Sequence, residues 1–139
     1  MVIQMRNSKF FILLAVILII ALSFAFSRRG KQPFKDLTAE DISSAAVTLS
    51  PPDKTIQISD LEKFVSYLND IIIYSKDNSY TEYAGQGVTF KLHMTDGSEL
   101  CITEYSPFFI INGTGYRTKY EPCEQLNRYA NELLNENSD

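Results

Sequence analysis

The sequence predicts an α+β protein: an N-terminal transmembrane helix followed by a small antiparallel sheet of about four strands with two packing helices. Three observations predict this class. An uncharged apolar run covers residues 10–26, apolar and polar residues alternate from Val88 onward, and two other segments repeat apolar residues at helical spacing. With 139 residues, the chain has room for one domain and a short additional segment.

The apolar run, FFILLAVILIIALSFAF, lies between Lys9 and the pair Arg28-Arg29. As a helix it extends about 25 Å, near the lower limit for crossing a bilayer. A cleaved secretory signal with a small-residue exit at residues 23–25 is the alternative. Because cations directly after the run hinder its translocation, and because it is longer than most cleaved signals, a retained signal anchor is favoured.

This interpretation divides the chain into four parts. They are a short basic tail (1–9), a transmembrane signal anchor (10–27), a linker (28–36) and an extracytoplasmic α+β domain (37–139). Cations flank both ends of the run, so charge does not fix the orientation, but a very short N-terminal tail usually stays in the cytoplasm. We therefore expect a single-pass protein of the cell membrane, held in the lipid bilayer through residues 10–27, with its C-terminal domain outside the cytoplasm.

The part of the chain after the anchor is acidic. Residues 32–139 hold 8 cations and 17 acids, a net charge of 8 − 17 = −9. Binding to a nucleic-acid backbone depends on clustered lysine and arginine side chains. Nucleic acid is therefore excluded as a partner, and an envelope protein or peptide is the expected one.

The first half of the domain predicts one strand and one helix. Residues 42–49 form a strand that Pro51-Pro52 ends, and residues 55–58 form an extended approach to the helix. Ser59 is expected to cap the helix, with Glu62 reaching back in a capping box. The apolar face of this helix consists of Leu61, Phe64, Val65, Leu68, Ile71 and Ile72. Residues 71–74 are either its last turn or the start of a strand, and residues 75–87 are a polar loop.

A β-hairpin follows, with Asp96-Gly97 at its turn. A two-residue loop would turn the apolar residues of the second strand onto the polar face. A three-residue loop, with Gly97 in the left-handed conformation, instead pairs Leu92 with Leu100 and Phe90 with Ile102. Because burial of one face decides the register, we predict the three-residue loop.

The last third predicts two short strands and a helix. Residues 108–112 form a strand, residues 112–115 the next turn, and residues 116–120 a short strand at the sheet edge. Pro122 suits the first position of a helix. The apolar stripe of that helix consists of Cys123, Leu126, Ala130, Leu133 and Leu134.

Two cysteines and one histidine are the candidates for site chemistry. Cys101 and Cys123 form a candidate disulfide, because an even cysteine count is typical of translocated domains, although a free cysteine also packs well on an apolar stripe. A thiol enzyme is the alternative: in the predicted hairpin His93 lies diagonally opposite Cys101 and would lower the pKa of its thiol. Since no third orienting group is evident, no catalytic residue is predicted. One histidine and two cysteines do not make a four-ligand zinc site, and no cofactor is expected.

Tyrosines lie in or beside the predicted loops. Tyr116, Arg117, Lys119 and Tyr120 form a candidate binding surface, with the cations on one face of the edge strand and the tyrosines on the other. The alternative is that these tyrosines cap a small core while their hydroxyl groups stay in water.

The segment NGTGYRTKYEPCEQLNRYANELL, preceded by DGSELCITEY, resembles uncharacterised small membrane-anchored proteins of low-GC Gram-positive bacteria. In these proteins an extracytoplasmic domain ends in a similar strand–tyrosine–helix segment. The resemblance covers residues 34–134 and implies a location in the bacterial envelope, without an activity or any functional residue. The resulting hypothesis is a membrane-anchored, non-enzymatic binding or sensing domain. A domain secreted after signal cleavage and a thiol enzyme using Cys101 and His93 are the alternatives.

Overall fold

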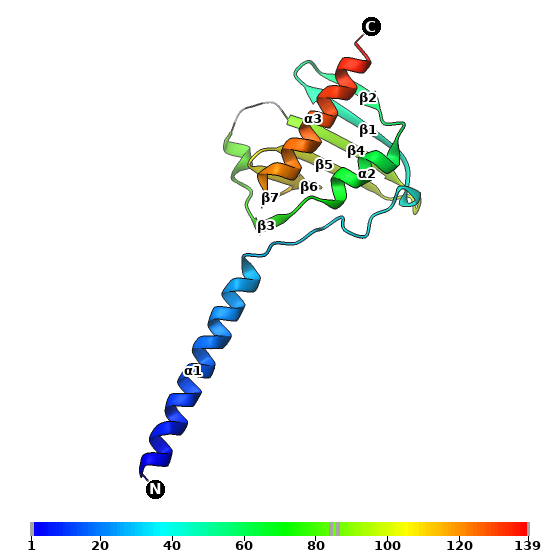
Figure 1. Cartoon of the computed structure of the whole chain (residues 1–139). Helices are drawn as coiled ribbons and strands as arrows, with labels where there is room; N and C mark the ends of the chain where they lie inside the picture. Colours follow the sequence, from blue (N-terminus) through cyan, green and yellow to red (C-terminus); the bar gives the residue numbers. More distant parts are fainter. Residues whose placement is uncertain (1, 84, 86, 139) are drawn as a thin grey trace. The chain divides into compact units, whose positions relative to one another are not determined.

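The computed structural model describes residues 2–83, 85 and 87–138. The chain forms two compact units, Met1–Gly30 and Lys31–Asp139. The first unit contains helix α1 (Val2–Ser27), shown in blue in Figure 1. Its segment Asn7–Phe26 is long and apolar enough to cross a membrane, either as an anchor or as a signal sequence.

The second unit is built on an antiparallel sheet of seven strands, so the prediction of about four strands was too low. The strands are β1 (Ile42–Ser50), β2 (Lys54–Gln57), β3 (Ile73–Lys76), β4 (Gly87–Met94), β5 (Glu99–Tyr105), β6 (Phe108–Ile111) and β7 (Thr114–Thr118). Their order across the sheet is β2-β1-β4-β5-β6-β7-β3. β2 and β3 have four residues each, too few to show a period in sequence, and they become strands by pairing with β1 and β7.

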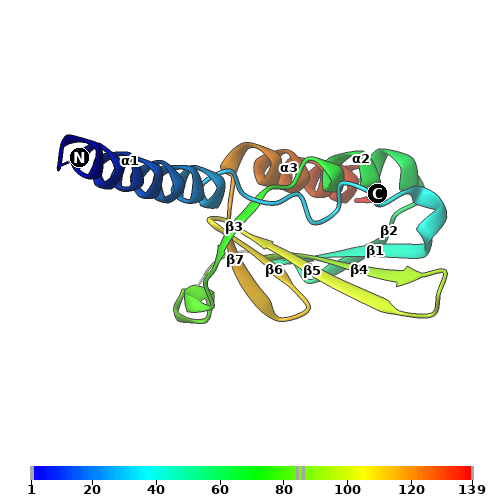
Figure 2. The same ribbon diagram turned by 90° about the horizontal axis from the view of Figure 1, so that it is seen from below.

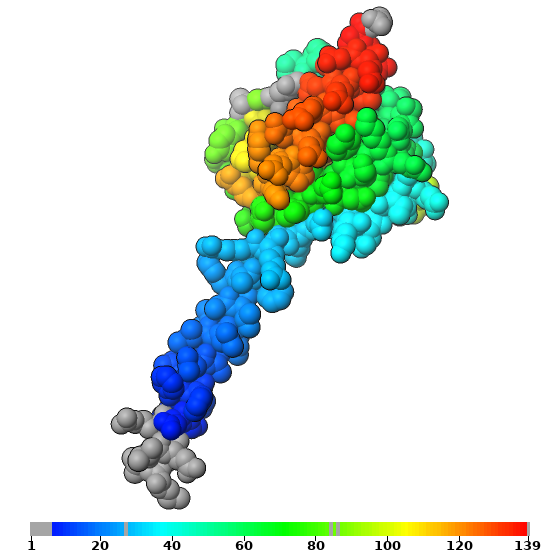
Figure 3. Space-filling model, viewed as in Figure 1, coloured from blue at the N-terminus to red at the C-terminus, as the bar shows by residue number. Residues whose placement is uncertain are grey.

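Helices α2 (Leu61–Asn69) and α3 (Tyr120–Glu136) cover one face of this sheet, as Figure 2 shows. We call it the helix face and the opposite one the open face. α3 lies beside α2 and hides the sheet from one side (Figure 3). Phe64 of α2 is fully buried and stacks on Phe90 of β4, with ring centroids 5.1 Å apart. Between the helices, Tyr129 of α3 stacks on Tyr67 of α2, with ring centroids 4.9 Å apart. The two-layer α+β class is therefore confirmed.

The register of the central hairpin is the predicted one. Leu92 pairs with Leu100 and Phe90 with Ile102, and Gly97 has a φ of 89°. Leu92, Phe90 and Ile102 are fully buried on the helix face. The burial of that face thus fixes the register, as the sequence argument required.

Both helix starts differ from the prediction by one or two residues. The cap of α2 is Asp60, whose side chain accepts a hydrogen bond from the backbone N–H of Lys63 at 3.0 Å, so Ser59 is not the cap. α3 begins at Tyr120, which places Pro122 in its third position. The proline fits there because the first backbone N–H groups of a helix have no acceptor within the helix.

The predicted linker 28–36 belongs in large part to the second unit. The backbones of Lys31 and Ile73 exchange two hydrogen bonds of 2.8 Å. Phe34 is 7% exposed, and its ring centroid lies 6.1 Å from that of Phe109. The composition of the segment suggested a linker, but one aromatic side chain buried in the core is enough to order it.

The β6–β7 connection is a two-residue turn, shorter than the predicted 112–115. Ile111 pairs with Thr114, and the intervening Asn112 and Gly113 have φ angles of 48° and 85°. Such left-handed pairs are typical of hairpin turns whose twist matches the flanking strands. Gly115 consequently lies within β7, and β7 is an inner strand with β3 beyond it, so residues 116–120 do not close the edge of the sheet.

Candidate functional site

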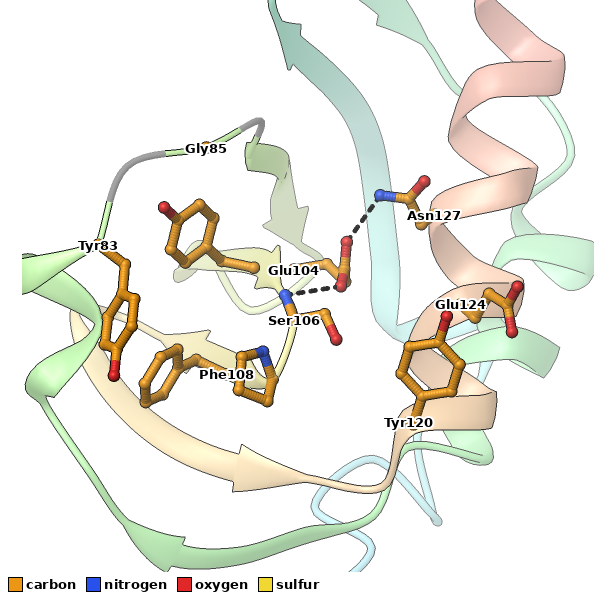
Figure 4. A pocket seen from close by; sticks show the side chains of 10 residues that line it. Tyr83, Gly85, Glu104, Ser106, Phe108, Tyr120, Glu124 and Asn127 are labelled. Atoms are coloured by element: carbon orange, nitrogen blue, oxygen red, sulfur yellow. Dashed lines mark hydrogen bonds between the residues drawn. The ribbon is translucent and has the colours of Figure 1, made fainter.

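A pocket of about 470 Å³ lies where the end of β5 meets the start of α3. Figure 4 shows side chains from β5, β6, α3 and the segment before β4 around it. We call it the Glu104 pocket. Its lining residues are Tyr83, Gly85, Glu104, Tyr105, Ser106, Pro107, Phe108, Tyr120, Glu124 and Asn127.

Glu104 reaches this pocket because of the alternation along β5. Leu100 and Ile102 face the helices, so the side chain two residues later lies on the same face. Glu104 is 3% exposed and is the one buried charged side chain in the part of the chain that the structure describes. A carboxylate thus occupies a position at which the strand pattern requires an apolar residue.

Two neutral donors hold the Glu104 carboxylate. The backbone N–H of Ser106 donates to its Oε1 at 3.0 Å, and the side-chain amide of Asn127 donates to its Oε2 at 2.8 Å, as the dashed lines in Figure 4 show. Asn127 is itself oriented by Asn131, whose amide donates to the Asn127 Oδ1 at 3.0 Å. The carboxylate is therefore fixed in one position at the junction of strand and helix.

Burial raises the pKa of the Glu104 carboxyl, although its hydrogen bonds with Asn127 and Ser106 act in the opposite direction. None of the ion pairs among residues 2–83, 85 and 87–138 includes Glu104. A buried carboxylate without a counter-ion is costly. The chain maintains this arrangement in a pocket through which a ligand could approach the carboxylate.

Aromatic rings form the walls of the pocket. Phe108 is 1% exposed, and the Tyr83 ring lies against it with centroids 5.5 Å apart. The guanidinium of Arg117 lies 4.6 Å from the centroid of the same Phe108 ring. Tyr120, the first residue of α3, is 61% exposed on the opposite side of the pocket (Figure 4).

The segment that carries Tyr83 is fastened to the β6–β7 hairpin. The Asp77 backbone N–H donates to the Gly115 carbonyl at 2.8 Å, the Asn78 Oδ1 accepts from the Gly115 N–H at 2.9 Å, and the Tyr80 hydroxyl donates to the Gly113 carbonyl at 2.8 Å. Hydrogen bonds with Ser79 and with Arg117 lower the pKa of Asp77 to about 2. We call residues 77–83, which include the short helix η2 (Ser79–Glu82), the clamp segment.

The structure divides the predicted binding surface among three environments. Tyr116 packs partly buried against the core on the helix face. Arg117 lies on the open face and forms an ion pair with Asp77 at 2.8 Å. Lys119 is exposed at the start of α3, and its backbone N–H donates to the Ile72 carbonyl. The four residues therefore do not form one surface, and Tyr120 alone lines the Glu104 pocket.

The candidate disulfide is not formed. Both cysteines are free: Cys101 is exposed on the open face, whereas Cys123 belongs to α3 and is buried on the helix face of the sheet, where the Thr118 hydroxyl lies 3.3 Å from its sulfur. The sheet lies between the two side chains, because Cys101 alternates with the core residue Ile102. Burial raises the pKa of the Cys123 thiol to about 12. The prediction of a disulfide is therefore corrected: Cys123 is a free cysteine that packs as an apolar residue.

In the structure His93 interacts with Glu99 and not with Cys101. His93 pairs with Glu99 across the hairpin, and its Nδ1 lies 3.2 Å from the Glu99 Oε1. Cys101 pairs with Lys91, as predicted, and lines a second pocket of about 610 Å³ on the open face together with Thr103 and Ile110. None of the described residues that line this second pocket carries a charged side chain. The Glu104 pocket therefore has the more specific chemistry of the two.

Replacing Glu104 by glutamine is expected to raise the stability of the fold relative to the natural protein, and to do so more at neutral pH than at acidic pH. The raised pKa means that the folded state favours the neutral carboxyl: Glu104 contributes most to stability below its ordinary pKa of 4.5, and this contribution is lost as the pH rises through the raised value. Glutamine does not ionise, so its own contribution to stability does not change over this pH range. The difference in melting temperature between E104Q and the natural protein should therefore grow from about pH 4 to about pH 7.

This difference is measured by thermal unfolding of both proteins, followed through the near-ultraviolet circular dichroism of their tyrosines. The other carboxyl groups are common to both proteins and cancel in the comparison. A difference that stays constant with pH would show that Glu104 has the same protonation in the folded and unfolded states.

Sequence reasoning missed Glu104, Asn127 and the aromatic walls. One signal was present: extending the Leu100–Ile102 alternation by one step places a charged residue on the apolar face of β5. No such signal exists for Asn127, which the helical period puts beside the core without specifying its neighbour. Comparison of the chain with protein-family models, with curated proteins and with solved structures finds no match.

Proposed function

We propose that this chain is a single-pass membrane protein whose N-terminal helix anchors a small, non-enzymatic binding or sensing domain outside the cytoplasm. The Glu104 pocket carries the binding role, since it places a buried carboxylate and four aromatic side chains around one concave site. The apolar segment Asn7–Phe26 supports the anchor. The location in the bacterial envelope follows the resemblance to membrane-anchored proteins.

The size of the pocket restricts what it can hold. About 470 Å³ lies in the lower part of the range of roughly 300–1,000 Å³ that small-molecule sites cover. A small molecule or a single side chain of an envelope peptide fits such a volume. Both oxygens of Glu104 are engaged by fixed donors, which favours recognition over proton transfer.

Orientation can be tested with the cysteines. A membrane-impermeant maleimide carrying a polyethylene glycol chain should label the full-length protein once on intact protoplasts, because Cys101 is exposed. Cys123 should react only after denaturation, since its thiol is buried and its pKa is raised to about 12. The shift of the membrane-bound protein on a denaturing gel gives both results.

The variant Cys101→Ser is the matched control and should remain unlabelled on protoplasts. Labelling that requires lysis would place the domain in the cytoplasm. Recovery of a shortened domain in the medium would favour a cleaved signal. If denatured protein reacted only after reduction, the two cysteines would be joined in the cell, contrary to the structure.

A further inference from the structure

The Glu104 pocket contains a negative charge that none of the described residues neutralises. Each oxygen of the Glu104 carboxylate accepts one hydrogen bond, from Ser106 and from Asn127, and both donors are neutral. A carboxylate oxygen has a second lone pair, so each can accept once more. A positively charged ligand would supply the counter-ion that the described residues do not.

The walls of the pocket suit a positively charged group as well. Tyr83, Tyr105 and Tyr120 line the pocket beside the buried Phe108, and aromatic faces attract cations through the ring quadrupole. Within this cluster Phe108 already accepts a guanidinium, that of Arg117, at 4.6 Å. Tyr83 and Tyr120 are exposed, so they can contact a ligand without any change in the core.

The negative charge around the pocket opposes the binding of an anion. Glu124 adds a second carboxylate to the lining, and no lysine or arginine is among the described residues that line the pocket. Residues 32–139 carry a net charge of 8 − 17 = −9. An anion would meet repulsion on approach and find no cation in the pocket, whereas a cation would be attracted at both stages.

We propose that the Glu104 pocket binds an organic ammonium group, with Glu104 as its counter-ion and the rings of Tyr83 and Tyr120 as its walls. The proposal rests on the binding role proposed above and specifies its ligand class. A metal ion fits less well, because no cluster of three or more histidine, cysteine or carboxylate ligands occurs among the described residues. Moreover, magnesium and calcium ions are coordinated by oxygen atoms, and the faces of aromatic rings supply none.

Binding is tested on the full-length protein in maltoside micelles, since zwitterionic detergents carry ammonium groups themselves. Choline and n-butylammonium serve as quaternary and primary probes, and neohexyl alcohol, in which carbon replaces the nitrogen of choline, is the neutral isostere. The amide signals of Ser106 and of the Asn127 side chain report on the site by NMR. We expect saturable shifts with at least one ammonium probe and affinity at least tenfold lower for the neutral alcohol.

Two variants locate the site. Glu104→Gln should weaken binding of the ammonium probe at least tenfold, while Glu121→Gln, which removes an equal charge from the same end of α3 outside the lining, should leave the affinity unchanged. Tyr120→Ala should weaken binding about two- to tenfold, because its exposed ring is one wall. The expected stability of E104Q at neutral pH separates loss of binding from loss of folding.

Three results would overturn the proposal: equal affinity for the neutral alcohol, equal effects of E104Q and E121Q, or the same shifts with magnesium chloride alone. Binding of the alcohol without the cations would retain the binding role and remove the ammonium class. Silence with every probe would remove the pocket from the binding role. The membrane orientation is decided independently by the labelling of Cys101.

Discussion

Replacing Gly115 by alanine is expected to lower the free energy of unfolding by about 3 kcal/mol. A Cβ at this position would collide with the carbonyl oxygen of Asp77 and lie 2.6 Å from the Cδ1 of Tyr80. Backbone atoms cannot move aside as the end of a flexible side chain can. The clamp segment must therefore lift from β7, which breaks the hydrogen bonds that Asp77 and Asn78 make with Gly115.

Denaturant unfolding of the full-length protein in maltoside micelles, followed by tyrosine circular dichroism, measures this loss. Gly97→Ala is the matched control. Gly97 has a φ of 89° with nothing near its Cβ position, so the cost there is that of the backbone alone, about 1 kcal/mol. Since the clamp segment also carries Tyr83, G115A should weaken ligand binding while G97A should not. Equal stability losses for G115A and G97A would contradict the close packing of the clamp segment on β7.

The variant Phe34→Ala should also lower the free energy of unfolding by about 3 kcal/mol, because it removes a buried ring. The composition of the segment that carries this ring had predicted a linker. Phe34 packs on Phe109, and its carbonyl accepts a hydrogen bond from the Asn69 side chain at 2.5 Å. Loss of the ring leaves a cavity beside these groups that a β-sheet and a helix cannot fill by moving together. The same unfolding experiment measures the effect.

Lys35→Ala is the control for this prediction. Lys35 is exposed and adjacent to Phe34, so its substitution should change the free energy of unfolding by less than about 0.5 kcal/mol. If residues 28–36 were a flexible linker, both substitutions would have the same small effect. A large difference between the two variants thus establishes where the folded domain begins.

Local patterns in the sequence were sufficient wherever a segment was long and one-sided. The alternation in residues 88–94 defined β4, and the requirement that one face be buried defined the register of its pairing with β5. The apolar residues at helical spacing after residue 60 predicted α2, and the uncharged apolar run at the N-terminus predicted α1. In each of these segments the same signal repeats over at least two periods.

The candidate site shows where local patterns fail. Arg117 and Lys119 have strand spacing, but the strand ends at Thr118, and an Asp77 from a distant loop neutralises Arg117. Cys101 and Cys123 have a spacing compatible with a bridge, but the sheet lies between them. Each of these outcomes depends on a residue or a layer that is remote in sequence.

By itself the sequence determined the apolar N-terminal helix, the α+β class, the central hairpin and the acidic charge, because each follows from composition or from a short period. Only the tertiary structure decided that β2 and β3 are strands, that Phe34 belongs to the core, and that Glu104 meets Asn127 beside Tyr83 and Tyr120. Strand pairing and pocket formation depend on which segments the chain brings together. A pattern within one segment carries no information about its partner, and it is the partner that converts an isolated glutamate into a candidate binding site.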